Sequence, residues 1–300
     1  MTKLTLDQAL TGISGILVTP FDAAGDIAPA RLAPILERAL KAGLHMPVVN
    51  GNTGEFYALT TAEAVTMVRE VAAMVAGRAP LLAGVGRGLR DAAQLARASA
   101  DAGAAALMVH QPPDPFVSPR GLVDYLSAIN DASGGLPMML YLRNDAIGTA
   151  AIADLCAVPG VKGVKWATPN PMKLAEAKAA CDPSIVWVGG LAEVWAPSFY
   201  AVGARGFTSG LINVWPERSL AIHAALEAGD YTKANALIAG MRVFEDIRAE
   251  EMGGTNVTGV KSALIAQGLD CGPTRPPSAW PLTASQATRL DRFLADNRLT

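Results

Sequence analysis

Short apolar runs alternate with longer amphipathic stretches along most of the chain, and this alternation constrains the fold more than any other feature. Strands that are buried on both faces of a parallel sheet read as continuous apolar runs of this kind. The sequence therefore predicts eight parallel strands. They are Gly15–Pro20, Met46–Asn50, Leu81–Val85, Ala106–His110, Pro137–Tyr141, Val161–Lys165, Val186–Gly189 and Gly206–Ser209.

Helix-like segments separate these strands, so that the chain reads as repeated strand–helix units. Thr61 fits an N-cap, with the acid Glu63 in the first helical turn, where the helix dipole favours a negative charge. Gly43, Gly103 and Gly203 fit positions just past helix ends, where positive φ is common. The expected helices are Ala30–Ala42, Ala62–Ala76, Asp91–Ala102, Arg120–Ala132, Thr149–Cys156, Pro171–Cys181, Ala192–Val202 and Glu217–Ala228.

Eight strand–helix units that close on themselves form an α/β fold, the (β/α)8 TIM barrel. A doubly wound sheet competes with it, but that fold requires a G-x-G-x-x-G turn after its first strand, and none is present. Three further helical segments, Thr232–Glu250, Val257–Gly268 and Ala284–Asp296, follow the eighth unit. We therefore predict a TIM barrel over residues 1–228 and a C-terminal helical extension over residues 229–300.

The composition bounds the class of protein. Hydrophobic residues make up 51% of the chain and charged residues 17%, with a net charge of -2. Such a chain buries a large core, which excludes disorder, and it has no basic patch for a nucleic acid. No apolar stretch is long enough for a membrane span, and the N-terminus lacks a signal-peptide pattern. Three scattered cysteines form no disulfide framework. We expect a cytoplasmic protein without membrane or nucleic-acid partners.

Lys165, at the end of the sixth expected strand, is the most informative polar residue. In a TIM barrel the active site lies at the C-terminal ends of the strands. Strand alternation puts Val161, Gly163 and Lys165 on one face, with the amine pointing into the barrel mouth. Desolvation lowers the pKa of a lysine and frees a nucleophilic amine that can form a Schiff base with a carbonyl. The alternative is an ordinary ion-paired lysine.

Other polar residues follow the expected strands at the same end. The turn Gly51–Glu55 offers backbone N–H groups, and Asn52 and Thr53 add side-chain donors, which suits a carboxylate or phosphate. Its alternative is a tight turn that opens a helix. Tyr141 could move a proton at the reacting carbon, or could cap the core with its hydroxyl in water. Thr19 could hold that hydroxyl or a water, or could simply end its strand.

Taken together, these motifs resemble a known superfamily. The turn Gly51–Glu55, the tyrosine Tyr141 and the triplet Gly163–Lys165 are similar in order and spacing to those of the dihydrodipicolinate synthase / N-acetylneuraminate lyase superfamily of class I aldolases. The resemblance runs from Gly15–Asp22 to Gly206–Gly210 and the C-terminal helices. It implies a TIM barrel, often tetrameric, that needs no metal or organic cofactor.

The resemblance also implies roles for individual residues. Lys165 resembles the Schiff-base lysine of the family and Tyr141 its proton-transferring tyrosine. Asn52 and Thr53 resemble the residues that bind the carboxylate of a 2-keto acid. In addition, we expect Thr208 and Ser209 to line the pocket.

Three departures separate the chain from dihydrodipicolinate synthases. Those synthases usually carry threonine at the position of Asn52, a tyrosine in the loop that matches Gln111–Phe116, and an arginine at the position of Ala146. The proton relay and the arginine for the second substrate therefore look absent. The segments Gly54–Leu59 and Tyr141–Ala146 are instead similar to the 5-dehydro-4-deoxyglucarate dehydratases, as is Arg275-Pro276-Pro277, though less specifically.

Arg143 is the residue on which the substrate prediction depends. It lies two residues beyond Tyr141, where that dehydratase branch also has an arginine. A guanidinium there could pair with the distal carboxylate of a sugar diacid, or could be a solvated loop residue. We therefore predict a Schiff-base lyase that cleaves or dehydrates a sugar-derived 2-keto-3-deoxy acid. The alternatives are a dihydrodipicolinate synthase, which condenses pyruvate with aspartate semialdehyde, and a catalytically silent keto-acid-binding protein.

Two further hypotheses rank lower. A phosphate-binding barrel would use Gly189-Gly190 and Ser209-Gly210 after the last two strands. A metal-dependent aldolase is less favoured because the histidines show no ligand spacing; they are His45, His110 and His223.

We also expect a homo-oligomer, a tetramer or a dimer. We expect the apolar loop Leu211–Pro216 to be exposed, where it would suit a subunit contact.

Overall fold

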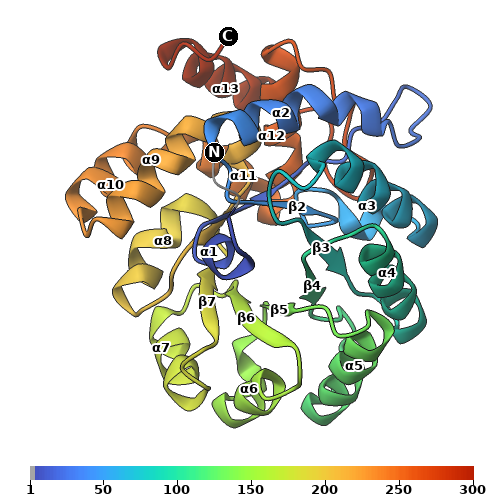
Figure 1. Cartoon of the computed structure of the whole chain (residues 1–300). Coiled ribbons are helices and arrows are strands. Elements are labelled where there is room, and N and C mark those ends of the chain that lie inside the picture. The colour runs from blue at the N-terminus through green and yellow to red at the C-terminus, as the bar shows by residue number, and fades with distance from the viewer. Residues whose placement is uncertain (1–3) are drawn as a thin grey trace.

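The computed structural model describes residues 4–300, apart from the side chain of Asp145. Its eight parallel strands close into a barrel in chain order, which confirms the predicted TIM barrel (Figure 1). The strands are β1 (Ile13–Ile16), β2 (Met46–Val49), β3 (Leu82–Val85), β4 (Ala106–His110), β5 (Met138–Leu142), β6 (Val161–Trp166), β7 (Val186–Gly189) and β8 (Phe207–Ser209).

Eight α-helices surround the barrel, and an apolar core fills the space between them and the strands. Gly43, Gly103 and Gly203 have positive φ just past helix ends, as predicted. The N-cap predicted at Thr61 lies one residue earlier, at Thr60, whose hydroxyl accepts from the N–H of Glu63 in a capping box. The helices are α2 (Ala33–Ala42), α3 (Thr61–Val75), α4 (Leu89–Asp101), α5 (Pro119–Ala132), α6 (Thr149–Cys156), α7 (Pro171–Ala180), α8 (Ala192–Ala201) and α9 (Pro216–Glu227).

A short helix, α1 (Leu6–Leu10), closes one end of the barrel. It lies across the barrel in Figure 1. Ala9 and Leu10 pack against a second apolar cluster inside the barrel, which includes Met46 and Met139. The sequence did not reveal this helix because five residues are too few to display a helical period. With this end filled, the site must be sought at the other end, where the strands finish.

The bounds of β1 and the alternation of β6 differ from the sequence prediction. The strand β1 ends at Ile16 rather than Pro20, because the N–H of Val18 bonds to the side chain of Asn213 instead of a neighbouring strand. In β6 the ladder to β5 shifts register near its start, so Val161 faces the outer core. Lys165 still shares its face with Tyr141, its ladder partner on β5.

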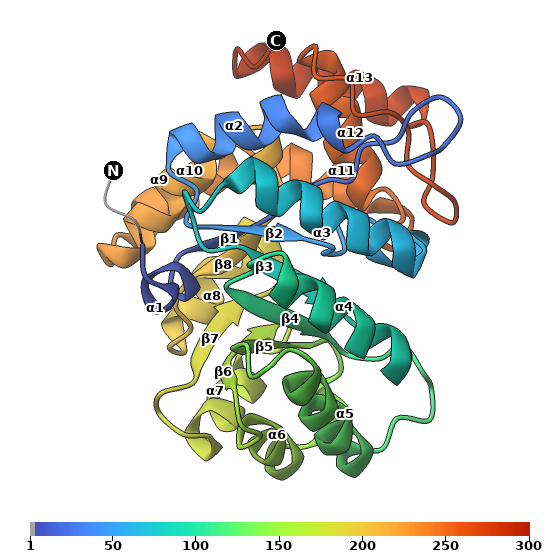
Figure 2. The same cartoon turned by 45° about the vertical axis from the view of Figure 1, so that its right-hand side comes forward.

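The C-terminal extension consists of α10 (Tyr231–Ala239), α11 (Arg242–Gly253), α12 (Asn256–Ala266) and α13 (Ala284–Asp296). The single helix predicted over Thr232–Glu250 is two helices, because Gly240 and Met241 interrupt it. Figures 1 and 2 place α12 and α13 beside α2, on one flank of the barrel. The loop Leu211–Pro216 is buried except for the half-buried Trp215, so the prediction of an exposed loop for a subunit contact is wrong. Within residues 4–300, no helix is both long and apolar enough to cross a membrane.

Candidate active site

Three side chains from three strand ends meet at the barrel mouth. Lys165 on β6 and Tyr141 on β5 are ladder partners, and the lysine Nζ lies 3.7 Å from the centre of the tyrosine ring. Asn52, in the turn after β2, donates a hydrogen bond from Nδ2 to the Tyr141 hydroxyl at 2.9 Å. The structure thus brings together the amine, the phenol and the turn that sequence reasoning had selected separately.

The Lys165 amine is buried and lacks a counterion among the described residues. The residue is 3% exposed, and burial lowers its pKa to about 7, with the like charge of Arg143 acting in the same direction. Among the described side chains, Lys173 and Lys261 are the lysines that form ion pairs, and Lys165 forms none. A large share of this amine is therefore neutral and nucleophilic near pH 7.

Tyr141 is buried beside this amine. Burial raises the pKa of its hydroxyl to about 12, so the phenol keeps its proton at neutral pH. Because Asn52 donates to the phenol oxygen, that bond does not use the phenol's own proton. Tyr141 is thus arranged as a proton donor next to a neutral amine.

The turn Gly51–Glu55 presents two unused backbone donors. The N–H groups of Gly54 and Glu55 bond within the turn, to Gly51 and Asn52 carbonyls. Those of Asn52 and Thr53 donate to no acceptor among residues 4–300. Two adjacent free N–H groups form a concavity that suits a carboxylate.

Three further residues were predicted to line the site, Thr19 and, on β8, Thr208 and Ser209, and their side chains point to different places. The Thr19 hydroxyl donates to the Gly54 carbonyl at 2.7 Å, so it supports the turn and does not hold Tyr141. Thr208 pairs with Ser14 and faces the barrel interior. Ser209 faces the opposite way, and its hydroxyl donates to Glu193 on α8 at 2.5 Å. The structure therefore does not bring Ser209 to the mouth, contrary to the sequence expectation, because successive strand residues alternate sides.

Arg143 stands at the rim of the site. It is exposed and lines a cavity of about 370 Å³ together with Tyr57 and Gln111. The Gln111 side chain accepts hydrogen bonds from the N–H groups of Arg143 and Asn144 and fixes the start of this loop. A cationic group thus borders open space outside the buried amine.

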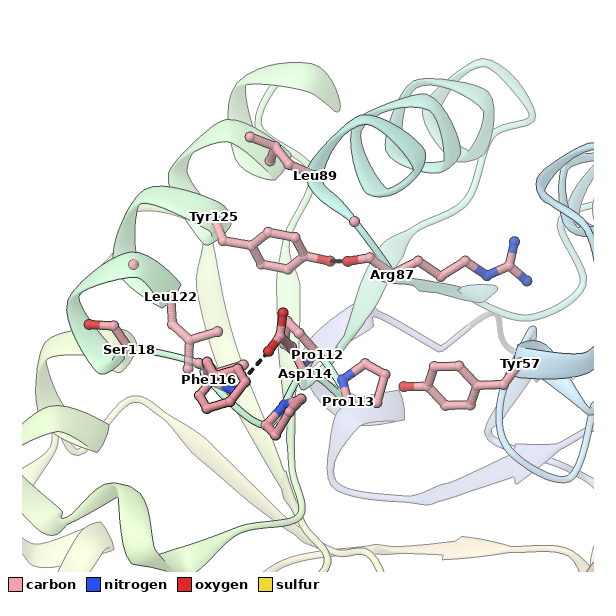
Figure 3. A pocket seen from close by; sticks show the side chains of 14 residues that line it. Tyr57, Arg87, Leu89, Pro112, Pro113, Asp114, Phe116, Ser118, Leu122 and Tyr125 are labelled. Carbon is pink, nitrogen blue, oxygen red and sulfur yellow. Dashed lines mark hydrogen bonds between the residues drawn. The ribbon is translucent and has the colours of Figure 1, made fainter.

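A larger hollow of about 740 Å³ adjoins this rim (Figure 3). The Arg87 guanidinium also lines the hollow, but one of its nitrogens already donates to the Phe56 and Leu59 carbonyl oxygens. The Tyr125 hydroxyl donates to the Arg87 carbonyl, as Figure 3 shows. Phe116 is 91% exposed beside the hollow. The walls are mostly apolar, so the hollow offers contact area rather than catalytic groups.

Sequence reasoning missed two kinds of supporting residue. His110 was considered only as a metal ligand, but it is buried, stacks on Phe56 at 4.4 Å and lies 2.9 Å from the Asn50 carbonyl. Burial lowers its pKa to about 3, so the ring is neutral. Lys261, on α12, contacts Glu55, the acid that ends the turn after β2. No local pattern could have found this pair, because its members come from opposite ends of the chain.

The lower-ranked hypotheses find little support in the described residues. At the proposed phosphate site the N–H of Gly190 already donates to the Trp166 carbonyl, and Gly210 packs against the Arg248 guanidinium. Within residues 4–300, no group of three or more His, Cys, Asp or Glu side chains could hold a metal ion.

Comparison with known proteins agrees with this geometry. The model of the dihydrodipicolinate synthetase family matches residues 9–296. The chain belongs to this family. It is therefore an enzyme of a family of class I lyases and dehydratases.

Relatives with two different enzyme names have the same sequence identity to this chain. A probable 5-dehydro-4-deoxyglucarate dehydratase of Streptomyces griseus is 30% identical over 99% of this chain and 96% of that protein. A 4-hydroxy-tetrahydrodipicolinate synthase of an Exiguobacterium species is 30% identical over 93% of this chain and 95% of the relative. The crystal structure of dihydrodipicolinate synthase from Oceanobacillus iheyensis superposes with a TM-score of 0.93, at 34% identity and 98% coverage of both chains.

Proposed function

We propose that this enzyme forms a Schiff base between Lys165 and a 2-keto acid, and that its substrate is a sugar-derived 2-keto-3-deoxy acid. One observation carries the proposal: a buried amine, with no counterion in the part of the chain that the structure describes, lies 3.7 Å from the ring centre of a buried phenol. A lysine amine can attack a carbonyl only when it is neutral, and this one has a pKa lowered to about 7.

The reaction follows from this pair. The neutral Lys165 amine adds to the C2 ketone, and the oxygen of the resulting carbinolamine takes one proton from the nitrogen and one from the Tyr141 hydroxyl, leaves as water and yields an iminium. In dehydration, the Tyr141 phenolate takes the C3 proton and returns it to the C4 hydroxyl, which leaves as water. In cleavage, the phenolate takes the proton of the C4 hydroxyl, the C3–C4 bond breaks, an aldehyde leaves, and Tyr141 returns the proton to C3 of the enamine. Hydrolysis of the iminium releases the product and restores the amine and the phenol.

The turn after β2 positions the substrate's C1 carboxylate. Asn52 and Thr53 supply two backbone N–H groups without protein acceptors, and Asn52 also holds the Tyr141 hydroxyl. Thr19 supports the turn from below through the Gly54 carbonyl, and Thr208 lines the interior wall. The carboxylate is therefore held next to the amine and the phenol, as near-attack geometry requires.

Two features favour a sugar diacid over aspartate semialdehyde as the reaction partner. Arg143 lies at the rim, where a guanidinium can take a distal carboxylate. The position expected to carry the semialdehyde-binding arginine of the synthases is Ala146, and the loop Gln111–Phe116 contains no tyrosine. These departures weigh against the synthase reading, although relatives of both names are equally similar.

Borohydride trapping tests the proposal. The protein is incubated separately with pyruvate and with 5-dehydro-4-deoxyglucarate, reduced, and mapped by mass spectrometry. We expect an adduct on Lys165 and none in the Lys165→Arg variant; no adduct with either acid would overturn the Schiff base. Released pyruvate indicates cleavage and a dehydrated product indicates dehydration, whereas an adduct without turnover indicates a silent binding protein. Turnover of pyruvate with aspartate semialdehyde would support the synthase instead.

We further propose that the enzyme is a cytoplasmic homo-oligomer, a tetramer or a dimer. The three cysteines are free thiols, as is usual in a reducing compartment. The exposed Phe116 and the adjoining apolar hollow offer a surface for a second copy. Sedimentation at micromolar concentration tests this assembly, and a monomer would contradict it.

A further inference from the structure

An ion pair joins the C-terminal extension to the carboxylate-binding turn. Nζ of Lys261, on α12, lies 2.6 Å from Oε1 of Glu55, and the two side chains are 0% and 2% exposed. Lys261 also donates to the Pro273 carbonyl at 2.8 Å and lies 4.2 Å from the centre of the Phe21 ring. Such a pair is stable only with both partners present, since either charge alone would be buried without compensation.

A second residue of the extension contacts the same acid. The backbone N–H of Arg275 donates to Oε2 of Glu55 at 2.8 Å. The Arg275 guanidinium donates to Glu63 at the start of α3 and to the Ala58 carbonyl. The extension therefore holds the chain at the end of the turn and again at the beginning of the next helix.

The backbone at Glu55 needs such support. Its φ is +55°, in the left-handed region that residues other than glycine seldom adopt. Its N–H donates to the Asn52 carbonyl, which sets the conformation of the two residues with free donors. A left-handed residue of this kind is strained and persists only where surrounding contacts enforce it.

We propose that Lys261 is a positioning residue for substrate recognition. Through Glu55 it holds the turn in the conformation that aims the Asn52 and Thr53 N–H groups at the substrate's carboxylate. The C-terminal extension is thereby part of the recognition machinery, not only a support for the barrel. This inference rests on the proposed role of the turn in binding the carboxylate.

The test compares a ketone that carries a carboxylate with one that does not. The double variant Glu55→Gln/Lys261→Met removes both charges, so neither is left buried alone. The ketone concentration giving half-maximal borohydride adduct on Lys165 is measured for pyruvate and for acetone. We expect it to rise at least tenfold for pyruvate and less than twofold for acetone, with the maximal adduct retained. Equal changes for the two ketones, or no change, would overturn the proposal.

Controls separate positioning from stability. The variant Arg292→Met/Asp296→Asn removes an exposed ion pair of α13 in the same extension and should leave both concentrations unchanged. Lys261→Arg keeps the positive charge, so this variant should retain most of the wild-type difference between the half-maximal concentrations of pyruvate and acetone. Should the double variant fail to fold, Glu55→Gln/Lys261→Gln, which also leaves no charge buried alone, is measured with the same expectation. A purely structural role would lower the melting temperature without changing the preference for pyruvate.

A third probe distinguishes failure of this inference from failure of the Schiff base. Lactate carries the carboxylate but no ketone, so its binding, followed by saturation-transfer NMR, needs no adduct on Lys165. If the wild type forms no adduct, the Schiff-base proposal fails, and weaker lactate binding by the double variant still supports the positioning role. Equal lactate binding by both proteins would overturn that role in either case.

Discussion

Two buried lysines occupy two regions of this molecule under opposite conditions. Lys165, at the barrel mouth, faces an aromatic ring and has no ion-pair partner among the described side chains. Lys261, between barrel and extension, pairs with Glu55 at 2.6 Å. Burial lowers the pKa of both, but at Lys261 the carboxylate opposes the shift. Both side chains are buried, so the presence or absence of an ion-pair partner, and not the degree of burial, distinguishes them.

The difference has a thermodynamic consequence. A buried lysine without an ion-pair partner destabilises the fold. Under the proposed function, the protein tolerates this cost at Lys165 because Schiff-base formation needs a neutral amine. A buried cation with a partner contributes to stability only as long as the pair is intact. Replacing Lys261 by an apolar side chain should therefore lower the free energy of unfolding, whereas the same replacement at Lys165 should raise it.

The largest effect is expected at Lys261. Lys261→Met leaves the Glu55 carboxylate buried without its cation, and we expect the free energy of unfolding to fall by about 3–5 kcal/mol. Urea denaturation measures this. The double variant Glu55→Gln/Lys261→Met should lose less, because no charge is stranded. A single variant as stable as the wild type would show that the pair contributes nothing.

Lys165→Met should have the opposite sign. Lowering a lysine pKa from 10.5 to about 7 corresponds to at most roughly 5 kcal/mol at 1.36 kcal/mol per unit, so we expect the variant to gain about 1–4 kcal/mol at pH 7. Turnover and adduct formation should disappear. The matched control is Lys162→Met, on the exposed side of the same strand, which should change stability by less than about 0.5 kcal/mol. Destabilisation by Lys165→Met would contradict the comparison.

Glu193 extends the comparison to a buried acid. Its carboxylate accepts hydrogen bonds from Ser209 and Ser219 but forms no ion pair among the described residues, and burial raises its pKa, followed by the charge of Glu245. A raised pKa means that the folded state binds more protons, so wild-type stability falls as pH rises from 4.5 through the raised value. Glu193→Gln should therefore gain about 1–2 kcal/mol relative to wild type between pH 5 and pH 8, measured by urea denaturation. If the stability difference between Glu193→Gln and the wild type is the same at pH 5 and at pH 8, Glu193 does not titrate in this range.

The smallest effect concerns Arg143. Its positive charge is the second cause that lowers the pKa of Lys165. In Arg143→Gln, the pH midpoint of pyruvate adduct formation should therefore move upward from near 7 by several tenths of a unit, since screening weakens an exposed charge. The exposed Arg292→Gln serves as a control with no expected shift. A downward or absent shift would remove Arg143 from the electrostatics of the site.

Much of the fold and part of the site follow from local sequence patterns. The apolar runs predicted seven of the eight strands to within one residue at each end. Only β1 was misplaced: it begins at Ile13 rather than Gly15 and ends at Ile16 rather than Pro20, where Asn213 bonds to Val18. The motif around Lys165 was sufficient to select the amine and Tyr141. The motif approach failed at Ser209, because strand alternation, not proximity in sequence to Thr208, decides which side a residue faces.

The sequence by itself determined the barrel, because strand and helix periodicities are properties of neighbouring residues. It also determined which side chains end the strands. Only the tertiary structure decided that Lys165 has no counterion within the described residues while Lys261 pairs with Glu55, because the field at a buried amine comes from residues far apart along the chain. The same holds for the turn: its glycines are visible in the sequence, but the contacts from the C-terminal extension that fix its conformation exist only after folding.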